Sequence, residues 1–403
     1  MVSRLVDNPW PPEWPNNRAA DAEAVAHSIQ QAAWSRGSAI PRFEQEFASF
    51  LGVRYALAVS NATYALRMGL QALGIEPSDE VIVPALTWPS TAVAVLDCGA
   101  TPVLADIDPR TYCLDTESLA ARMTSRTRAV IPVHLYCSAV DMVKLCAFCN
   151  RHELRILEDA AQCHGARWGD RSLGCIGHAG VFSFHEKKLL PCGEGGCVVT
   201  NDEDIYARLH ELRDHGVRAP GLVTDRPPIT GGNNRMGTLQ AALLSSRLRY
   251  LDQVIHDEAE NAELLKSELS DLDELCAIER PGGVSLQTYY SFCWKLRSIN
   301  RDDFLRRVSM NTGIEWAKPY APLSRGFNDF CSRHPMRKIL NQVEANFEAP
   351  VAEAAWDSQG IRFHHSVLLA GRRRITWFGE MIRKTIEECS KAGELTPVGS
   401  AFK

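Results

Sequence analysis

A lysine beside a glycine-rich turn is the first candidate for chemistry in this sequence. Residues 183–196 are SFHEKKLLPCGEGG, and the apolar run Ala179 to Phe184 before them predicts a buried strand. The strand carries the Ser183 hydroxyl and is followed by two lysines and a glycine-rich turn. Glycine is needed where the backbone approaches another backbone segment or a ligand too closely for a Cβ atom. A lysine held there can act as a Schiff-base nucleophile, and the alternative is a surface lysine pair on a loop.

An aspartate ends a second apolar run, residues 154–159. Because ligands of open α/β sheets lie outside the carboxyl ends of strands, Asp159 is expected where a ligand would bind. Pyridoxal phosphate requires such an acid, since its protonated ring nitrogen makes the ring an electron sink. The same carboxylate could instead cap the next helix.

A strand that runs into a helix through small polar residues provides a candidate phosphate site. Residues 59–66 are VSNATYAL, so free backbone N–H groups at Ala62 and Thr63 and nearby hydroxyls are expected at the helix start. Helix N-termini bind phosphate through such groups. Ser60 or Asn61 could also serve only as an N-cap, which is compatible with phosphate binding.

Composition describes an ordinary globular chain. The 403 residues have a formal net charge of −5, and no basic stripe indicates nucleic-acid binding. No uninterrupted apolar run is long enough to span a membrane, and the first residues do not resemble a signal peptide, so we expect a cytoplasmic protein without membrane contact. Cys146 and Cys149 form one Cys-x-x-Cys without the further ligands that a zinc site needs, so we predict no metal.

Strand and helix patterns alternate along the first half of the chain. This alternation predicts a parallel sheet covered by helices, and therefore an α/β fold. The predicted elements are Tyr55 to Val59, Thr63 to Gly74, Glu80 to Val83, Pro89 to Cys98, Thr101 to Asp106, Ser118 to Met123 and Arg128 to Pro132.

Three units are expected along the chain. Residues 1–35 form an arm and a helix, in which the proline-rich stretch 10–15, WPPEWP, is not helical and its tryptophans are expected to pack against another element. Residues 36–250 form the large domain. The long amphipathic stretch 236–272 leads into residues 251–403, a smaller α+β domain.

The lysine segment and the Asp159 strand together resemble those of the DegT/StrS-type sugar aminotransferases, pyridoxal-phosphate enzymes of fold type I. The family pattern Ser-Phe-x-x-x-Lys…Gly-Glu-Gly-Gly is matched from Ser183 to Gly196, and its register selects Lys188 rather than Lys187. The resemblance implies a mostly parallel central sheet in the large domain, with Lys188 linked to the cofactor. It places Asp159 at the ring nitrogen and Ser183 at the phosphate.

The same resemblance implies further cofactor contacts and a partner subunit. It puts Ala62 and Thr63 at the phosphate, although glycine is common in the family where this chain has Ala62. The indole of Trp88 would stack on the ring; packing against the neighbouring helix is the alternative. The Gln162 amide would meet the phenolic oxygen. Residues 231–236, GGNNRM, resemble a motif whose asparagine, here Asn233, reaches the partner's phosphate in a homodimer with shared active sites.

Lys188 implies transamination, with pyridoxamine phosphate between two half-reactions. Several stretches, among them WPPEWP at 10–15, TYY at 288–290 and FHHSVLL at 363–369, resemble glutamine-dependent scyllo-inosose or 2-deoxy-scyllo-inosose aminotransferases of aminoglycoside and aminocyclitol pathways. We therefore expect an amino-acid donor, L-glutamine first, and a keto cyclitol or keto sugar acceptor. Tyr320 is a candidate substrate contact or a core tyrosine.

Other functions remain open. The 363–369 stretch also resembles 3-amino-5-hydroxybenzoate synthases, although that subgroup usually has histidine where this chain has Gln162. A nucleotide-sugar aminotransferase is another alternative. A non-catalytic regulator of the same fold is disfavoured because Lys188, Asp159 and Ser183 are all present. No Gly-x-Gly-x-x-Gly follows the first strand, which argues against a nicotinamide oxidoreductase.

Overall fold

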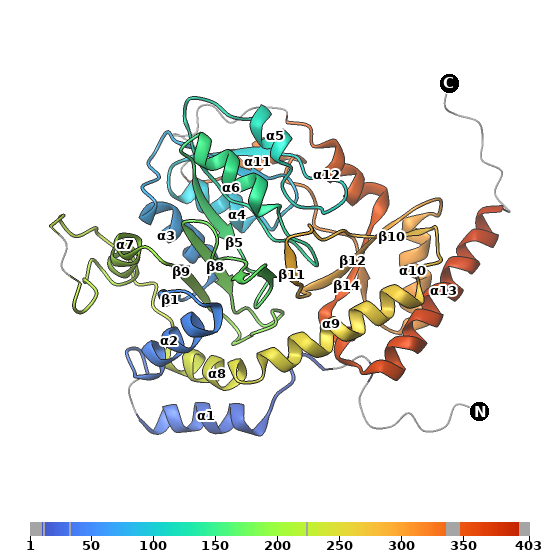
Figure 1. Ribbon diagram of the computed structural model, residues 1–403, viewed down its shortest axis with the longest axis horizontal. Helices are drawn as coiled ribbons and strands as arrows, with labels where there is room; N and C mark the ends of the chain where they lie inside the picture. The colour runs from blue at the N-terminus through green and yellow to red at the C-terminus, as the bar shows by residue number, and fades with distance from the viewer. Residues whose placement is uncertain (1–9, 11–12, 32–33, 223–224, 336–346, 395–403) are drawn as a thin grey trace.

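The computed structural model describes residues 10, 13–31, 34–222, 225–335 and 347–394 (Figure 1). Its largest sheet has seven strands in the order β1-β9-β8-β5-β4-β2-β3. These are β1 (Tyr55–Val59), β2 (Glu80–Pro84), β3 (Thr101–Ala105), β4 (Thr127–Val130), β5 (Arg155–Asp159), β8 (Ala179–Ser183) and β9 (Gly196–Thr200). The strands are parallel except that β9 runs antiparallel to β1 and β8. The predicted α/β class with a mostly parallel sheet is confirmed.

Helices cover both faces of this sheet. One face packs against α3 (Ala62–Ala72), α4 (Ser90–Asp97) and α7 (Glu203–Arg213), and the other against α2 (Ala39–Leu51), α6 (Met142–Arg151) and α8 (Thr238–Leu248). Successive residues of a strand point to opposite faces, so Leu57 lies in one core and Ala58 in the other. Burial on both faces explains why these strands are continuous apolar runs.

The predicted long amphipathic stretch, 236–272, contains two helices. Helix α8 ends at Leu248, and α9 (Leu251–Glu268) begins after Tyr250. Helix α9 leads from beneath the seven-stranded sheet toward a second sheet, as Figure 1 shows. The helix predicted within residues 1–35 is α1 (Ala19–Gln30), which packs on α8.

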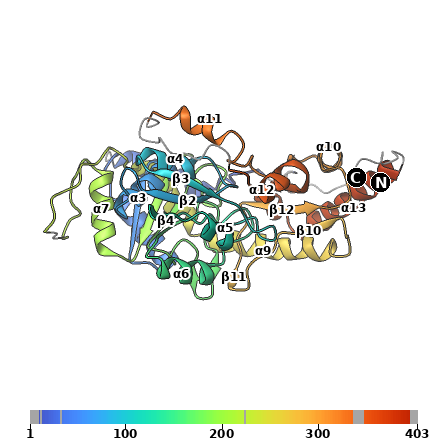
Figure 2. The ribbon, with the colours of Figure 1, turned by 90° about the horizontal axis from the view of Figure 1, so that it is seen from above.

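The second sheet is antiparallel and has the strand order β10-β12-β14-β13. Its strands are β10 (Leu275–Ala277), β12 (Ser291–Leu296), β13 (Trp316–Ala317) and β14 (Gly360–His364), and it packs against α10 (Arg301–Thr312) and α13 (Arg372–Glu394). Figure 2 shows this sheet and α13 to one side of the seven-stranded sheet. Aromatic rings fill the core there, among them Trp316, Phe363 and Phe378.

Shorter elements complete the chain. These are α5 (Thr116–Ala121), α11 (Phe327–Ser332), α12 (Pro350–Ala354), a π-helical turn (Ala355–Gln359) and the 3-10 helix η2 (His365–Leu369). A small sheet pairs β11 (Val284–Leu286) with β6 (Arg167–Trp168), which pairs with β7 (Arg171–Ser172). Strand β11 thus links the region beyond residue 250 to the earlier part of the chain, and the division at 35 and 250 stays a prediction.

The tryptophans of the N-terminal arm pack as expected where they are described. The Trp10 ring lies 5.2 Å from that of Trp377, and its indole N–H donates to the Thr312 carbonyl at 2.7 Å. Residues 11 and 12 of the predicted arm lie outside the described part of the chain. Within that part, no helix combines the length and apolarity needed to cross a bilayer.

Candidate active site

A cavity of about 840 Å³ opens beyond the carboxyl ends of β5 and β8. The predicted site residues that line it are Ala62, Thr63, Trp88, Asp159, Gln162, Ser183, Lys188 and Tyr320. They come from segments spread over most of the chain, and the fold brings them together around one cavity. Asn233 is not among its lining residues.

Lys188 enters this cavity from the turn that follows β8. The turn is closed by hydrogen bonds from the Phe184 N–H to the Gly195 carbonyl and from the Lys188 N–H to the His185 carbonyl, both 2.9 Å long. Burial lowers the pKa of the Lys188 amine, although Tyr290 and Asp159 oppose that shift. A lowered pKa leaves more of the amine in the neutral form that acts as nucleophile or base.

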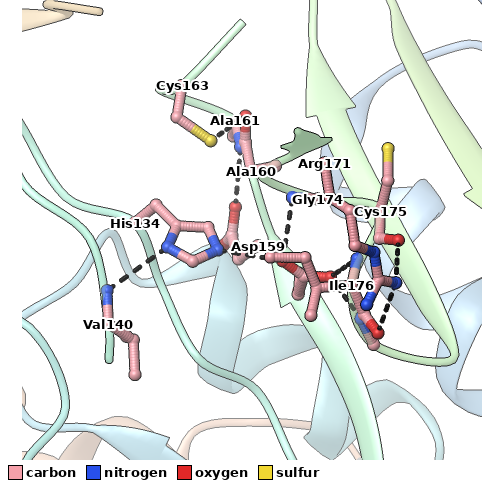
Figure 3. A network of polar contacts seen from close by, with 12 residues as sticks. His134, Val140, Asp159, Ala160, Ala161, Cys163, Arg171, Gly174, Cys175 and Ile176 are labelled. Carbon is pink, nitrogen blue, oxygen red and sulfur yellow. Dashed lines mark hydrogen bonds and ion pairs between the residues drawn. The ribbon is translucent and has the colours of Figure 1, made fainter. Parts of the chain in front are cut away.

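Asp159 is held in a fixed orientation at the end of β5. One carboxylate oxygen accepts the Ala161 N–H at 3.2 Å (Figure 3), and the other accepts the Thr91 hydroxyl at 3.0 Å. Burial raises the pKa of Asp159, and these two bonds together with Lys188 oppose the rise. A buried acid facing a cavity suits a ligand group that carries positive charge or a proton.

The start of α3 presents free backbone donors to the same cavity. Asn61 caps the helix by accepting the Tyr64 N–H at 2.9 Å, while the N–H groups of Ala62 and Thr63 have no partner among the described residues. Ala62 lies in ordinary helical backbone rather than at positive φ, so alanine replaces glycine without strain. These donors and the Ser183 hydroxyl can hold an anion such as phosphate.

Close backbone packing explains why residue 196, at the end of the lysine turn, is glycine. A Cβ atom on Gly196 would lie 2.6 Å from the Ala62 nitrogen, closer than any side chain tolerates. Strand β9 therefore passes directly against the start of α3, and only glycine permits that approach.

Two polar side chains predicted at the site bind each other. The Gln162 amide donates to the Tyr320 hydroxyl at 3.2 Å, and its oxygen accepts the Tyr136 N–H at 3.0 Å. Trp88 is 57% exposed, and its ring lies edge-on to that of Tyr320 at 5.3 Å. Tyr320 is therefore both packed among aromatic rings and exposed to the cavity.

Asn233 lies near the segment that precedes α3 and does not line the cavity. It forms an isolated bridge with Asp214, and the carbonyl of the next residue, Asn234, accepts the Ser60 N–H at 2.9 Å. Contacts within the same chain hold this segment, and they leave Asn233 outside the cavity of that chain.

Several lining residues were not predicted as site residues. They are Trp14 of the arm, Thr91 on α4, Tyr290 before β12 and Arg362 on β14. Trp14 and Tyr290 fall in stretches that the sequence comparison with the inosose enzymes had singled out. Nothing local marks Thr91 or Arg362, since each meets the cavity only through tertiary packing.

Known proteins resemble this chain along most of its length. The model of the DegT/DnrJ/EryC1/StrS aminotransferase family matches residues 15–348. The L-glutamine:2-deoxy-scyllo-inosose aminotransferase of Streptomyces lividus is 35% identical over 94% of this chain and 96% of that protein. The L-glutamine:scyllo-inosose aminotransferase of Streptomyces griseus is 32% identical over 95% and 96%. The crystal structure of 3-amino-5-hydroxybenzoic acid synthase superposes with a TM-score of 0.83, at 30% identity, over 94% of this chain and 98% of that one.

The chain therefore belongs to the DegT/DnrJ/EryC1/StrS aminotransferase family. It has the fold type I architecture and is a pyridoxal-phosphate-dependent aminotransferase, as the sequence predicted. The cavity fits this cofactor because it combines a buried acid, a lysine of lowered pKa and unpartnered N–H groups at a helix start.

Proposed function

We propose that this enzyme moves an amino group from L-glutamine to a keto cyclitol, a ring ketone bearing several hydroxyls. The observation that carries the proposal is the convergence of Lys188, Asp159 and the start of α3 on one cavity. The two inosose aminotransferases named above, similar over nearly the whole chain, support this choice of donor and acceptor.

Each predicted residue then has a defined task. Bound pyridoxal phosphate supplies an electron sink for charge that develops at the carbon beside the nitrogen. The Asp159 carboxylate holds the proton of the ring nitrogen, and the backbone N–H groups of Ala62 and Thr63 bind the phosphate together with the Ser183 hydroxyl. Lys188 would hold the cofactor through its amine, and the same amine can donate and accept a proton as general acid and base.

The charges around the cavity favour a neutral acceptor over a nucleotide-linked sugar. Glu186, Glu194 and Glu315 line it, against the cations Lys187 and Arg362 besides Lys188. A diphosphate would meet these carboxylates at a cost, whereas carboxylates accept hydrogen bonds from the hydroxyls of a polyol. Trp88 and Tyr320 provide flat surfaces for the cofactor ring or the cyclitol.

The first test uses Lys188→Ala beside Lys187→Ala as the matched control. Lys188→Ala should lose the visible absorption of lysine-linked cofactor and all turnover, whereas Lys187→Ala should keep both because its side chain is exposed. L-glutamine should change that absorption more than L-glutamate or L-alanine. A panel of scyllo-inosose, 2-deoxy-scyllo-inosose and a nucleotide-linked keto sugar, followed by mass spectrometry, then names the acceptor. Amination of the nucleotide sugar alone would overturn the cyclitol assignment.

We propose further that the enzyme is a homodimer in which Asn233 serves the partner's phosphate site. Asn233 does not line the cavity of its own chain, and large apolar side chains lie exposed, including Trp34 at 59% and Trp88 at 57%. Mixing inactive Lys188→Ala with inactive Asn233→Ala subunits should restore activity at about a quarter of the sites, since one site of each hybrid dimer is intact. No recovery on mixing would argue for a site made by one chain.

We assign the enzyme to the cytoplasm. All thirteen cysteines are free thiols, and free thiols persist in a reducing compartment. Cell fractionation would test this location.

A further inference from the structure

The backbone of Tyr290 is held by hydrogen bonds to two segments that are distant from it in the sequence. It directly precedes β12, its N–H donates to the Tyr136 carbonyl at 3.2 Å, and its carbonyl accepts the His365 N–H at 3.4 Å. Its side chain lines the cavity that holds Lys188. The backbone is therefore held on both sides while the ring faces the site.

The Lys188 amine lies against this ring. Its Nζ atom is 4.0 Å from the centroid of the Tyr290 ring, which is the geometry of a cation–π contact. The aromatic face attracts the charged amine, and so it opposes the effect of burial, which favours the neutral one.

The Tyr290 ring packs beside the His364 ring, whose centroid is 6.3 Å away. Tyr320 lines the same cavity, and its hydroxyl accepts the Gln162 amide N–H at 3.2 Å. Burial alone would raise the pKa of Tyr290, but nearby Lys188 and Tyr320 outweigh that effect and lower it.

We propose that Tyr290 is a positioning residue for Lys188: its ring face seats the amine in the cavity and strengthens the amine's hold on its proton. The inference rests on the proposed role of Lys188 as the lysine that binds the cofactor and transfers the proton. A proton-transfer group works best when its pKa is close to the operating pH. A contact that changes the proton affinity of Lys188 therefore affects the proposed reaction.

Other charged and titratable groups face Lys188 from the elements around it. Asp159 on β5 raises the pKa of the amine and Arg362 on β14 lowers it. His164 and His365 are buried and, with pKa values of about 3, stay neutral near pH 7. Changing only residue 290 leaves all four in place, so its effect reports on the ring.

The experiment measures the proton affinity of Lys188 in the full-length protein freed of cofactor. Formaldehyde and cyanoborohydride methylate neutral amines, and mass spectrometry of the Lys188 peptide across a pH series gives the midpoint. Tyr290→Phe keeps the ring and should keep the midpoint. Tyr290→Leu removes the ring and should lower the midpoint by about one pH unit. The acid limb of the kcat profile, which reports groups of the substrate-bound enzyme, should move the same way.

Internal and matched controls separate this effect from a general disturbance. Lys266, whose Nζ lies 5.6 Å from the Tyr289 ring outside the cavity, is read in the same digest and should not shift. Tyr289→Phe should leave the Lys188 midpoint unchanged. If Tyr290→Leu does not fold, Tyr290→Met replaces it, because methionine is flexible enough to fill the space.

A midpoint in Tyr290→Leu equal to or above that of the unaltered protein would overturn the proposal. So would a Tyr290→Phe protein that shifts as far as Tyr290→Leu, because the hydroxyl rather than the ring would then be responsible. The labelling needs neither cofactor nor substrate. It therefore stays readable if the proposed donor or acceptor is wrong.

Discussion

Two buried histidine–glutamate pairs lie near the candidate site, and they differ in the hydrogen bonds that the glutamate accepts. His134 and Glu158 lie behind Asp159, with His134 Nε2 at 3.1 Å from a Glu158 oxygen. His365 and Glu258 lie behind the lysine turn, with His365 Nδ1 at 2.6 Å from a Glu258 oxygen. All four side chains are fully buried, so burial alone does not explain the difference.

Backbone donors surround the first glutamate. Glu158 accepts N–H groups from Gly174 at 2.8 Å, Ile176 at 2.6 Å and Gly177 at 2.5 Å, in addition to His134 (Figure 3). Glu158 therefore joins the 174–177 turn to β5 immediately before Asp159.

The second glutamate has no such donors. Its Oε2 atom has no partner within the described chain, and burial raises the pKa of Glu258 well above its usual value. Burial also lowers the pKa of His365 to about 3. Both shifts favour the uncharged forms, which teaches that a buried carboxyl without backbone N–H donors holds its proton more tightly even when a histidine is its partner.

The largest effect should come from Glu158→Gln. Glutamine offers one acceptor oxygen where the carboxylate offers two, so at least one backbone N–H loses its partner and the amide meets another donor. We expect the free energy of unfolding to fall by roughly 2–4 kcal/mol, measured by urea denaturation. Cofactor retention should weaken as well, because Asp159 follows directly. If Glu158→Gln lowered the free energy of unfolding no more than Glu258→Gln does, the backbone donors would not distinguish the two glutamates.

A smaller effect is expected for His134→Phe. The carboxylate of Glu158 keeps its three backbone donors and loses only the imidazole N–H. The free energy of unfolding should fall by about 1–2 kcal/mol, which the same denaturation experiment would resolve. A loss greater than that of Glu158→Gln would show that the histidine, not the backbone, carries the network.

The smallest effect at low pH should come from Glu258→Gln. Because the pKa of Glu258 is raised in the folded protein, wild-type stability falls as pH rises above the unfolded value of about 4.5, and glutamine removes this loss. His365, with its pKa lowered to about 3, loses stability as pH falls from 6.5 in both proteins. Near pH 5 the variant should differ by about 1 kcal/mol or less. At pH 8 it should be the more stable protein. Equal destabilisation at both pH values would contradict a neutral pair.

Much of the fold followed from local pattern. The strand at Tyr55–Val59 was predicted to the residue, and strands β2, β3, β4, β5 and β8 of the same sheet were predicted with small differences at their ends. Strands buried on both faces are short apolar runs between turns, which makes them easy to recognise. The sequence predicted one amphipathic stretch, 236–272, and did not locate the break near Tyr250 that separates α8 from α9. Periodicity does not reveal such a break when both helices bury the same kind of face.

The candidate site likewise contains residues that the sequence predicted and residues that it did not. Lys188, Asp159 and the start of α3 were predicted because each follows a strand and carries a residue type with an evident task. The positions of Thr91, Tyr290 and Arg362 were not, because each comes from an element whose approach depends on packing. The assignment of site residues to particular cofactor contacts stays a prediction for the experiments above.

The sequence by itself determined which groups this protein carries to the sheet edge: a lysine in a glycine-rich turn, an acid at a strand end and a polar helix start. Tertiary structure alone decided their chemical state. Burial lowers the pKa of Lys188 and raises that of Asp159, the Tyr290 ring meets the lysine amine, and one glutamate is supplied with backbone donors while the other is not. Residue type is local, but the solvation and the partners that set a charge come from segments far apart in the chain.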